Sequence, residues 1–455
     1  MTSGLPEVIA RYHELLTADV AAESQAMLSD AQKRRGVYFG ERPLCTALRP
    51  RFFSSDQYRY VRARCALLLN AMGRLLRAAL QDSGVRRQFH LTDWEEELVA
   101  LDPAIPEPSP TSRFDSFYFP ETGVLWLTEY NAETPTGAAY GDTLADIFLA
   151  LPVMRQFLKT MDVRPLPARH GVLHAVLGSY AAWRGARAAA AAPRIAILDW
   201  REVPTFSEFV LFQEYFRSHG LEVVIVDPRE TEFRNGRLLA EGGPVDVIYK
   251  RVLISELIDR CGMSHAVVRA VRDGAVCMVN GFRCKLLHKK ASFAVLGDEQ
   301  NAGLFSPDER QAIAAHIPWT RLLEERKTRH DGKEIDLVPF VLRQREGLVL
   351  KPNDEYGGKG VVLGWEVTDA VWQERVRQGL TEPHVVQERV PVPREPYPSV
   401  VDGTLQITDR IVDTDPFACQ GAYVEGCLSR LSTAALVNVT AGGGSQVPTM
   451  LVEPR

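Results

Sequence analysis

The sequence predicts a mixed fold, in which a helical N-terminal region precedes an α/β region and then an α+β region. Apolar residues recur at helical spacing from residue 5 to about residue 100. From Arg194 onwards, short apolar strands alternate with helices, a pattern typical of a parallel sheet. From Cys284 onwards, helices and strands mix without that alternation. A chain of 455 residues is long enough for two or three lobes.

The N-terminal region is expected to be helical because its apolar residues fall on one helix face. Val8, Tyr12 and Leu15 have this spacing, and residues 60–80 make a longer amphipathic segment. Residues 103–110 are rich in proline, which favours an extended connector. This connector marks the predicted boundary of the helical region.

A polar hairpin is predicted directly after the connector. Apolar strands on both sides of a turn at residues 120–123 carry Arg113, Asp115, Glu129 and Asn131. Because side chains alternate along a strand, Glu129 and Asn131 share a face, and a paired neighbour can bring the other two to it. Two carboxylates and an amide oxygen suit Mg²⁺, and the adjacent arginine can fork onto a phosphate. A solvated polar sheet face is the alternative.

A helix over residues 143–151 is expected after this hairpin. Gly137 precedes it, and would either let a phosphate or carboxylate approach the backbone or simply begin the helix.

Polar residues end the expected strands of the α/β region. These strands cover residues 195–199, 221–227 and 245–249, and no Gly-x-Gly-x-x-Gly motif follows the first, which disfavours a dinucleotide site. Arg251 lies at such a strand end, where open α/β sheets bind ligands, and the family resemblance described below implies that this region lines a substrate cleft, so Arg251 and Glu256 are expected to contact a substrate. Ion pairing on a helix surface is the alternative.

The most specific segment of the chain is a glycine-rich hairpin. An apolar strand carries Lys351, and a second apolar strand follows the loop Gly357, Gly358, Lys359 and Gly360. Glycines let backbone N–H groups approach a polyanion, and a lysine at a strand end supplies the positive charge that a nucleotide triphosphate requires. The Walker motif is absent. An ordinary glycine-rich hairpin is the alternative.

Together these motifs resemble the ATP-grasp ligases, in which Arg-x-Asp and Glu-x-Asn motifs hold Mg²⁺ and a glycine-rich hairpin closes over ATP. Here the acidic motifs come first, an order similar to the circularly permuted branch and to the synthetase part of glutathionylspermidine synthase. Residues 287–291 resemble the first ATP lysine of that branch, and residues 386–390 resemble its adenine-contacting hinge. Residues 421–426, followed by Arg430, resemble its terminal glycine-aromatic strand. The likeness begins near Arg113.

The resemblance implies a circularly permuted ATP-grasp fold with a Rossmann-like lobe before the nucleotide-binding lobes, and ATP and Mg²⁺ as cofactors. The implied metal ligands are Asp115, Glu129 and Asn131. The implied ATP contacts are Lys290, Lys351, Gly357, Gly358, Lys359, Gly360, Gln387, Glu388 and Val390, and the implied catalytic residues are Arg113 and Arg430. Lys289 is an alternative to Lys290, because alternation cannot fix the register. Lys359 either reaches the γ-phosphate or solvates the hairpin tip.

The implied activity joins a small-molecule carboxylate, an amino acid or peptide, to an amine through an acyl phosphate, releasing ADP and phosphate. A non-catalytic ATP-binding module that senses nucleotide or scaffolds partners is the alternative, and a Rossmann-type sugar or nucleotide enzyme is a third hypothesis. The sequence shows no counterpart of the amidase domain of the synthase, and residues 438–444 differ from it, so the polyamine substrate does not carry over. The implied domains are residues 1–110 (helical), 111–165 (metal-binding), 166–284 (Rossmann-like) and 285–455 (nucleotide-binding).

Composition argues against several other classes of function. The net charge is −5 and the basic residues form no dense block, so nucleic-acid binding is not expected. Seven cysteines without Cys-x-x-Cys spacing indicate a reducing compartment. His170 and His174 lie four apart, but without a third ligand they are not taken as a metal site. Neither a secretion signal nor an apolar run of membrane-spanning length is seen. A cytoplasmic protein without a membrane partner is expected, with a homodimer as one option.

Overall fold

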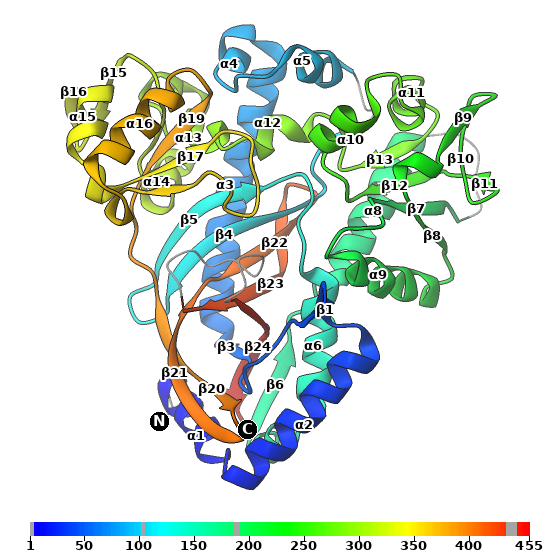
Figure 1. The fold of residues 1–455 in the computed structure, drawn as a ribbon, viewed down its shortest axis with the longest axis vertical. Coiled ribbons are helices and arrows are strands. Elements are labelled where there is room, and N and C mark those ends of the chain that lie inside the picture. Colours follow the sequence, from blue (N-terminus) through cyan, green and yellow to red (C-terminus); the bar gives the residue numbers. More distant parts are fainter. Residues whose placement is uncertain (1–3, 102–104, 186–191, 434–443) are drawn as a thin grey trace.

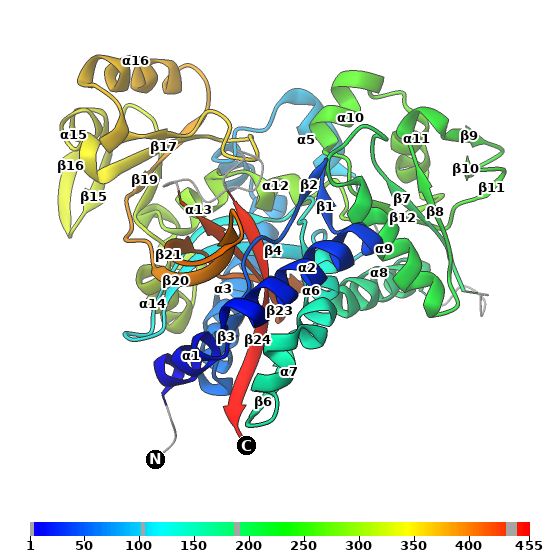
Figure 2. The ribbon, with the colours of Figure 1, turned by 60° about the horizontal axis from the view of Figure 1, so that its bottom comes forward.

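The computed structural model describes residues 4–101, 105–185, 192–433 and 444–455. Figure 1 shows a large antiparallel sheet at the centre, with a smaller antiparallel sheet and its helices (yellow) on one side. A parallel sheet with helices (green) lies on the other side. In Figure 2 the yellow and green lobes stand apart above the central sheet. The mixed α/β character predicted from the sequence is confirmed.

The N-terminal region is helical, as its apolar spacing predicts. Its helices are α1 (Leu5–Glu14), α2 (Ala18–Arg35), α3 (Ser55–Gln81), α4 (Ser83–Arg87) and α5 (Asp93–Ala100). α3 begins with a capping box, because the Ser54 hydroxyl accepts the Gln57 N–H at 3.2 Å and the Gln57 side chain accepts the Ser54 N–H at 3.0 Å.

Short strands interrupt this region, which corrects the expectation of helices throughout. They are β1 (Tyr38–Phe39), β2 (Arg42–Pro43) and β3 (Arg51–Phe53). β3 pairs in parallel with β24 (Ser445–Pro454), near the C-terminus. No local pattern reveals a pairing between segments so far apart in the chain.

The central sheet joins strands from early and late parts of the chain. In the order β20-β21-β23-β22-β4-β5, its strands are Arg394–Val401, Thr404–Val412, Tyr423–Ser432, Asp415–Cys419, Thr111–Phe119 and Val124–Asn131. β24 pairs with β23 and with β6 (Met161–Pro165). β22 pairs with β4 so that Phe417 lies opposite Arg113. The polar hairpin β4–β5 therefore lies beside strands from the last part of the chain.

The glycine-aromatic strand expected from residue 421 is present but begins slightly later, because β23 covers Tyr423–Ser432. Ala422 lies in the tight turn between β22 and β23, where Gln420 and Gly421 have φ of 54° and 60°. Most of the segment 438–444 lies outside the described residues.

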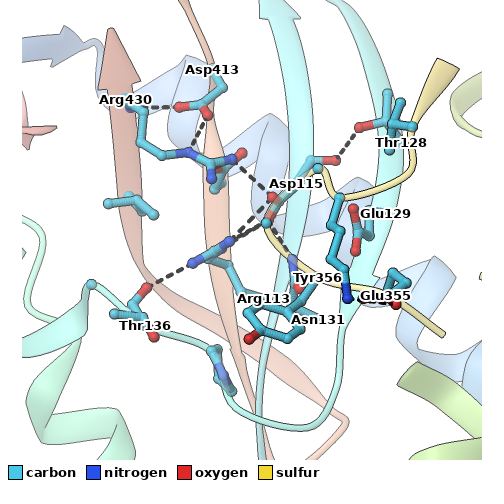
Figure 3. A pocket seen from close by; sticks show the side chains of 18 of the residues that line it. Arg113, Asp115, Thr128, Glu129, Asn131, Thr136, Glu355, Tyr356, Asp413 and Arg430 are labelled. Carbon is cyan, nitrogen blue, oxygen red and sulfur yellow. Dashed lines mark hydrogen bonds and ion pairs between the residues drawn. The ribbon is translucent and has the colours of Figure 1, made fainter. Parts of the chain in front are cut away.

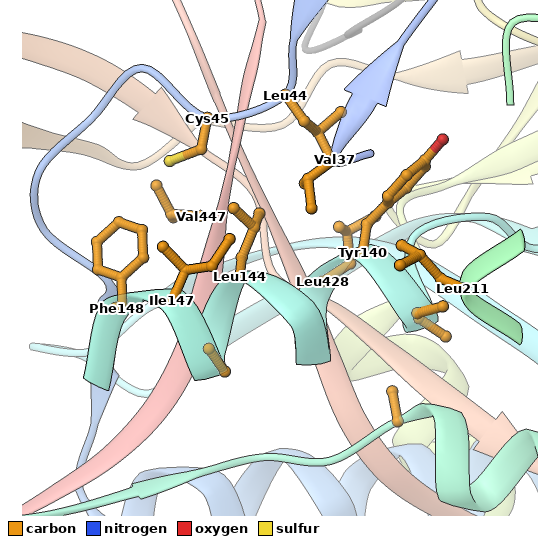
Figure 4. Packing of buried hydrophobic residues seen from close by; sticks show 14 of the residues in the cluster. Val37, Leu44, Cys45, Tyr140, Leu144, Ile147, Phe148, Leu211, Leu428 and Val447 are labelled. Atoms are coloured by element: carbon orange, nitrogen blue, oxygen red, sulfur yellow. The ribbon is translucent and has the colours of Figure 1, made fainter. Parts of the chain in front are cut away.

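The helix expected from Thr143 begins earlier, and α6 covers Ala138–Ala150. Gly137 lies at its start with φ of 111°. The Glu208 carboxylate accepts the backbone N–H groups of Gly137 at 2.8 Å and Ala139 at 3.2 Å, so it satisfies two donors that a helix start leaves unpaired. This contact favours the simple helix-start interpretation of Gly137. In Figure 4, Leu144, Ile147 and Phe148 of α6 lie in the same packed cluster as Val447 of β24; α7 (Pro152–Phe157) follows.

The α/β region forms a parallel sheet, as predicted. Its order is β13-β12-β7-β8, with strands Cys277–Val279, Val247–Lys250, Arg194–Leu198 and Glu222–Val226. Its helices are α8 (Arg169–Arg184), α9 (Phe206–Ser218), α10 (Ile254–Cys261) and α11 (Ala266–Arg272). A small sheet of β9 (Glu232–Arg234), β10 (Arg237–Ala240) and β11 (Gly243–Pro244) lies beside it.

The glycine-rich hairpin belongs to the smaller antiparallel sheet. This sheet has the order β14-β19-β17-β18, with strands Thr320–Leu322, His384–Glu388, Leu348–Pro352 and Val362–Leu363. The hairpin β15 (Lys327–His330) and β16 (Lys333–Asp336) and the helices α15 (Leu337–Arg343) and α16 (Asp369–Gly379) complete this lobe. The helices α12 (Cys284–His288), α13 (Ala291–Leu296) and α14 (Pro307–His316) connect it to the parallel sheet. None of the described helices combines the length and apolar character that a membrane span requires.

Candidate nucleotide and metal site

A cavity of about 640 Å³ lies where the three sheets meet. Its lining includes the predicted metal, lysine and arginine residues, together with the loop glycines 357 and 358 and the hinge residues Gln387, Glu388 and Val390. Lys359 also lines it, whereas Gly360 does not, because it packs against Pro352 at the base of the loop. The structure therefore brings nearly every sequence-predicted site residue to one place.

The hairpin β4–β5 presents an acidic face to this cavity. Arg113 pairs with Asn131 and Asp115 pairs with Glu129 across the two strands, after a register shift between Asp115 and Ser116, so the four side chains share one face. The Asn131 amide donates to Asp115 at 2.8 Å. Figure 3 shows Arg113, Asp115 and Asn131 joined by these contacts, with Glu129 alongside.

Two arginines hold Asp115. The Arg113 guanidinium donates to it at 2.8 and 3.2 Å and to the Thr136 carbonyl at 2.7 Å, and Arg430 donates to it at 2.8 Å. Burial alone would raise the pKa of Asp115, but the two guanidinium groups outweigh it and lower the pKa to about 2. Asp115 is thus ionised throughout the physiological range.

Asp413 and Asp415 surround Arg430 on its other side. Arg430 donates to Asp413 at 2.5 Å and lies 2.8 Å from Asp415, which is fully buried. Burial, followed by the nearby acidic groups, raises the pKa of Asp415 well above its usual value. The sequence analysis missed both residues, although their Asp-x-Asp spacing at the start of an apolar strand was a usable signal.

Two lysines face the acidic hairpin from the opposite side of the cavity. Lys290 lies 3.2 Å from Glu129 and donates to the Glu355 carbonyl at 2.5 Å, and Lys351 donates to the Thr128 carbonyl at 3.2 Å. Burial lowers the pKa of Lys351 to about 8, with a further lowering from Lys290. Lys290 therefore contacts a carboxylate of the hairpin directly, whereas Lys351 contacts its backbone.

Lys289, the alternative to Lys290, points elsewhere. Its ammonium group lies 2.9 Å from Glu95 and 3.4 Å from Asp354, in a buried cluster behind the cavity. The chain turns sharply here, because α12 ends at His288 and α13 starts at Ala291. That turn sends two adjacent lysines in different directions, and only Lys290 of the two lines the cavity.

The glycine loop has the backbone geometry that its composition predicts. Gly357, Gly358 and Gly360 have φ of 64°, 75° and 72°, which favours glycine at each position. Lys359 is exposed and pairs with Glu355 at 3.1 Å, so it lies at the hairpin tip rather than deep in the cavity.

Of the expected ATP contacts in the hinge, Glu388 uses its backbone N–H for a hydrogen bond within the protein. The N–H of Glu388 donates to the Trp319 carbonyl at 2.8 Å and so belongs to the sheet. The Gln387 side chain accepts from Lys351 at 2.7 Å, which orients that lysine. Val390 lines the cavity where the chain leaves the smaller sheet.

Arg251 and Glu256 line the cavity but are already engaged within the protein. Arg251 is buried and donates to the Pro135 carbonyl at 2.5 Å and to the Thr136 hydroxyl at 2.8 Å. Glu256 accepts from Trp200 and Tyr356, each at 3.1 Å. Both residues line the cavity, and their role as substrate contacts stays a prediction.

The oxygen donors fit a magnesium ion that also binds phosphate. Among the described residues, no group of three or more His, Cys, Asp or Glu side chains is arranged to hold a metal ion. The ring centroids of His170 and His174 lie 4.2 Å apart, with the rings tilted by 47°. Mg²⁺ commonly uses only one or two carboxylates and takes its other ligands from phosphate and water. Asp115, Glu129 and the Asn131 oxygen are donors of that kind, and in this structure both oxygens of Asp115 accept from the guanidinium groups of Arg113 and Arg430.

Comparisons with known proteins give a distant but consistent picture. No family model matches the chain. A Frankia alni protein described as "Putative glutamate--cysteine ligase 2-3" is 25% identical over a region that covers 70% of this chain and 36% of that protein. The chain thus matches only about a third of that relative's length.

Solved structures show the fold more directly than the sequences do. A glutathione synthetase-like effector from Globodera pallida aligns over 95% of this chain and 97% of its own, with a TM-score of 0.60 and 10% identity. A structure from Methylobacillus flagellatus, titled as a γ-glutamylcysteine synthetase, has a TM-score of 0.40 and 11% identity over 85% of this chain and 88% of its own. The first match shows that this chain shares the fold of the glutathione synthetase-like effector.

Proposed function

We propose that the protein is an ATP-dependent carboxylate–amine ligase with a circularly permuted ATP-grasp arrangement. The observation that carries the proposal is the single cavity where an acidic hairpin from early in the chain faces two lysines and a glycine loop from late in the chain. The names of the relatives, a glutamate–cysteine ligase and a glutathione synthetase-like effector, favour an amino acid or peptide as the carboxylate substrate.

The domain assignment follows from this proposal. Residues 1–110 would form the helical region, and residues 111–165 would carry the metal ligands. Residues 166–284 would form a Rossmann-like lobe, a reading favoured by the parallel sheet β13-β12-β7-β8. Residues 285–455 would supply the nucleotide-binding lobes.

The reaction needs a good leaving group on the carboxylate, because oxide cannot leave. Transfer of the γ-phosphoryl group of ATP to the carboxylate gives an acyl phosphate, and attack by the amine then displaces phosphate. The protein supplies positioning and charge neutralisation. Lys290 and Lys351 would bind the α- and β-phosphates. Mg²⁺, held by Asp115, Glu129 and Asn131, would neutralise charge on the phosphates.

Arginines and the glycine loop would serve the transfer step. Arg113 would bind the transferring phosphoryl group from beside Asp115, and Arg430 would bind phosphate or the substrate carboxylate. The loop 357–360 would cover the γ-phosphate and exclude water, which would otherwise hydrolyse the acyl phosphate. The hinge at Gln387, Glu388 and Val390 would lie against adenine.

Hydroxylamine provides a test that does not require the natural amine. Protein, MgATP and pooled amino acids and short peptides are incubated with hydroxylamine, which attacks an acyl phosphate to give a hydroxamate and phosphate. We expect hydroxamate and ADP in equal amounts, and a loss of at least about 100-fold in Glu129→Ala, which removes one metal ligand. ATP binding without hydroxamate from any pool would instead support the non-catalytic module.

Nucleotide binding should weaken as the pH rises through about 8. The pKa of Lys351 lies near 8 in the free protein because burial disfavours its charge, and bound phosphate would raise it again. Binding then takes up a proton, so MgATP affinity falls by about tenfold between pH 7 and pH 9. Calorimetry in buffers of different ionisation enthalpy measures this uptake. Lys351→Met should bind weakly and lose this pH dependence; an unchanged profile would contradict the assignment.

A further inference from the structure

A hydrogen bond connects the segment of the glycine loop to the parallel-sheet lobe at the cavity. The Tyr356 hydroxyl donates to a Glu256 carboxylate oxygen at 3.1 Å. Tyr356 directly precedes Gly357 and Gly358, and Glu256 lies on α10. Both residues line the cavity. The contact therefore joins two lobes that lie on opposite sides of the proposed nucleotide site.

Glu256 is held ready to accept this bond. Its other carboxylate oxygen accepts from the Trp200 indole N–H at 3.1 Å, and Trp200 is only 1% exposed. The guanidinium groups of Arg260 and Arg229 lie 4.5 and 5.5 Å from the centroid of the Trp200 ring. Because Trp200 already holds the Glu256 carboxylate, little side-chain entropy is lost when Tyr356 donates to it. The charge of the carboxylate further strengthens this hydrogen bond.

Tyr356, by contrast, has little packing of its own. Its side chain is 52% exposed, although it is a large aromatic residue next to a cavity. The two glycines after it have positive φ and carry no side chain that could anchor the loop. Lys359, the remaining charged side chain of the loop, pairs with Glu355 of the same hairpin. The Tyr356–Glu256 bond is therefore a side-chain contact between the loop and the opposite lobe.

We propose that Tyr356 is a positioning residue, which holds the glycine loop closed over the cavity by donating to Glu256. The inference rests on the ligase function proposed above. With the loop closed, the acyl phosphate would meet the amine and not water. With the loop open, water would attack the acyl carbon and phosphate would leave, which returns the carboxylate. ADP would then form without an amide or hydroxamate product.

Tyr356→Phe removes the donor and keeps the ring. We expect about tenfold faster hydrogen–deuterium exchange at the Lys359 and Val361 amides, whose N–H groups donate to Tyr356 and Gly358 carbonyls within the loop, each at 3.2 Å. This exchange measurement needs no substrate, so it tests the loop even if the ligase proposal fails. Tyr180→Phe, on α8 and away from the cavity, is the matched control and should exchange like the unmodified protein.

The catalytic readout is the ratio of ADP to hydroxamate. We expect a ratio near one in the unmodified protein and about 3–10 in Tyr356→Phe. The closed loop has one hydrogen bond to a charged group that the open loop lacks, so its removal raises the share of the open loop and of hydrolysis. Glu256→Ala should raise the ratio to the same extent, and the double variant should not exceed either single one, because both changes break the same bond. Unchanged exchange in Tyr356→Phe, or additive effects in the double variant, would overturn the proposal.

Discussion

Arg113→Ala is expected to bind MgATP nearly as well as the unmodified protein while its turnover falls by at least about 100-fold. Removal of one donor to a transition-state oxygen typically costs about 2.7–4 kcal/mol. Arg113 is 7% exposed and lies between Asp115 and the Thr136 carbonyl, so its guanidinium has a fixed direction toward the cavity. Steady-state hydroxamate formation and a separate nucleotide titration measure the two quantities.

Two further variants distinguish catalysis from simple destabilisation. Arg113→Lys keeps the positive charge but cannot form two parallel hydrogen bonds as a guanidinium does, so it should recover only a minor part of the turnover. Arg326→Ala is the matched control, because Arg326 also forks onto a carboxylate, that of Asp298, at 2.6 and 3.1 Å, but does not line the cavity. It should change stability and not turnover. Near-normal turnover in Arg113→Ala would remove Arg113 from the mechanism.

The hairpin and the common face of Glu129 and Asn131 could be predicted from the sequence, because they depend on local geometry. Side chains of a strand alternate with a period of two, and a short turn places the two strands in antiparallel register. A regular register from that turn would place Asp115 opposite Thr128. A register shift between Asp115 and Ser116, which alternation does not describe, places it opposite Glu129 instead. The same local reasoning gave the glycine hairpin, where Val349 pairs with Leu363.

Features that depend on distant pairing could not be predicted in this way. The Asp-x-Asp spacing could have marked Asp413 and Asp415 as candidate polar residues, but no local pattern shows that β22 pairs with β4, which brings them to the site. The choice between Lys289 and Lys290 depended on the turn between α12 and α13, which alternation does not describe. Glu256 was correctly placed near the cavity, but its partners, Trp200 and Tyr356, come from other segments.

A buried ionic cluster behind the cavity is expected to make a large contribution to the free energy of unfolding, because it joins three parts of the chain. Glu133 has no exposed surface and follows the acidic hairpin by two residues. It accepts from Lys250 at 3.3 Å and from the Ile254 N–H at 2.5 Å, and it lies 3.6 Å from Lys285. The cluster thus joins the central sheet, the parallel-sheet lobe and the segment that leads to the nucleotide lobe.

Glu133→Ala is expected to destabilise the protein by about 3–5 kcal/mol, because it removes the salt-bridge partner of the fully buried Lys250. Chemical denaturation monitored by tryptophan fluorescence measures the loss. Glu374→Ala is the matched control: Glu374 pairs with Arg377 at 3.0 Å on the surface of α16, and its loss should cost no more than about 0.5 kcal/mol. Equal effects of the two substitutions would contradict this account.

The pH dependence of stability and a second substitution also test whether the Glu133–Lys250 charge pair stabilises the fold. Burial would raise the pKa of Glu133, but Lys250 and Lys285 lower it to about 2, below its ordinary value of 4.5. The ionised Glu133 carboxylate therefore contributes about 3 kcal/mol to the free energy of unfolding. This contribution is fully present above pH 4.5 and is lost as the pH falls toward 2. This part of the acid sensitivity should be missing in Glu133→Gln. Lys250→Met should restore part of the stability lost in Glu133→Ala, because it removes the unpaired buried charge; a further loss would mean that packing, not charge, sets the cost.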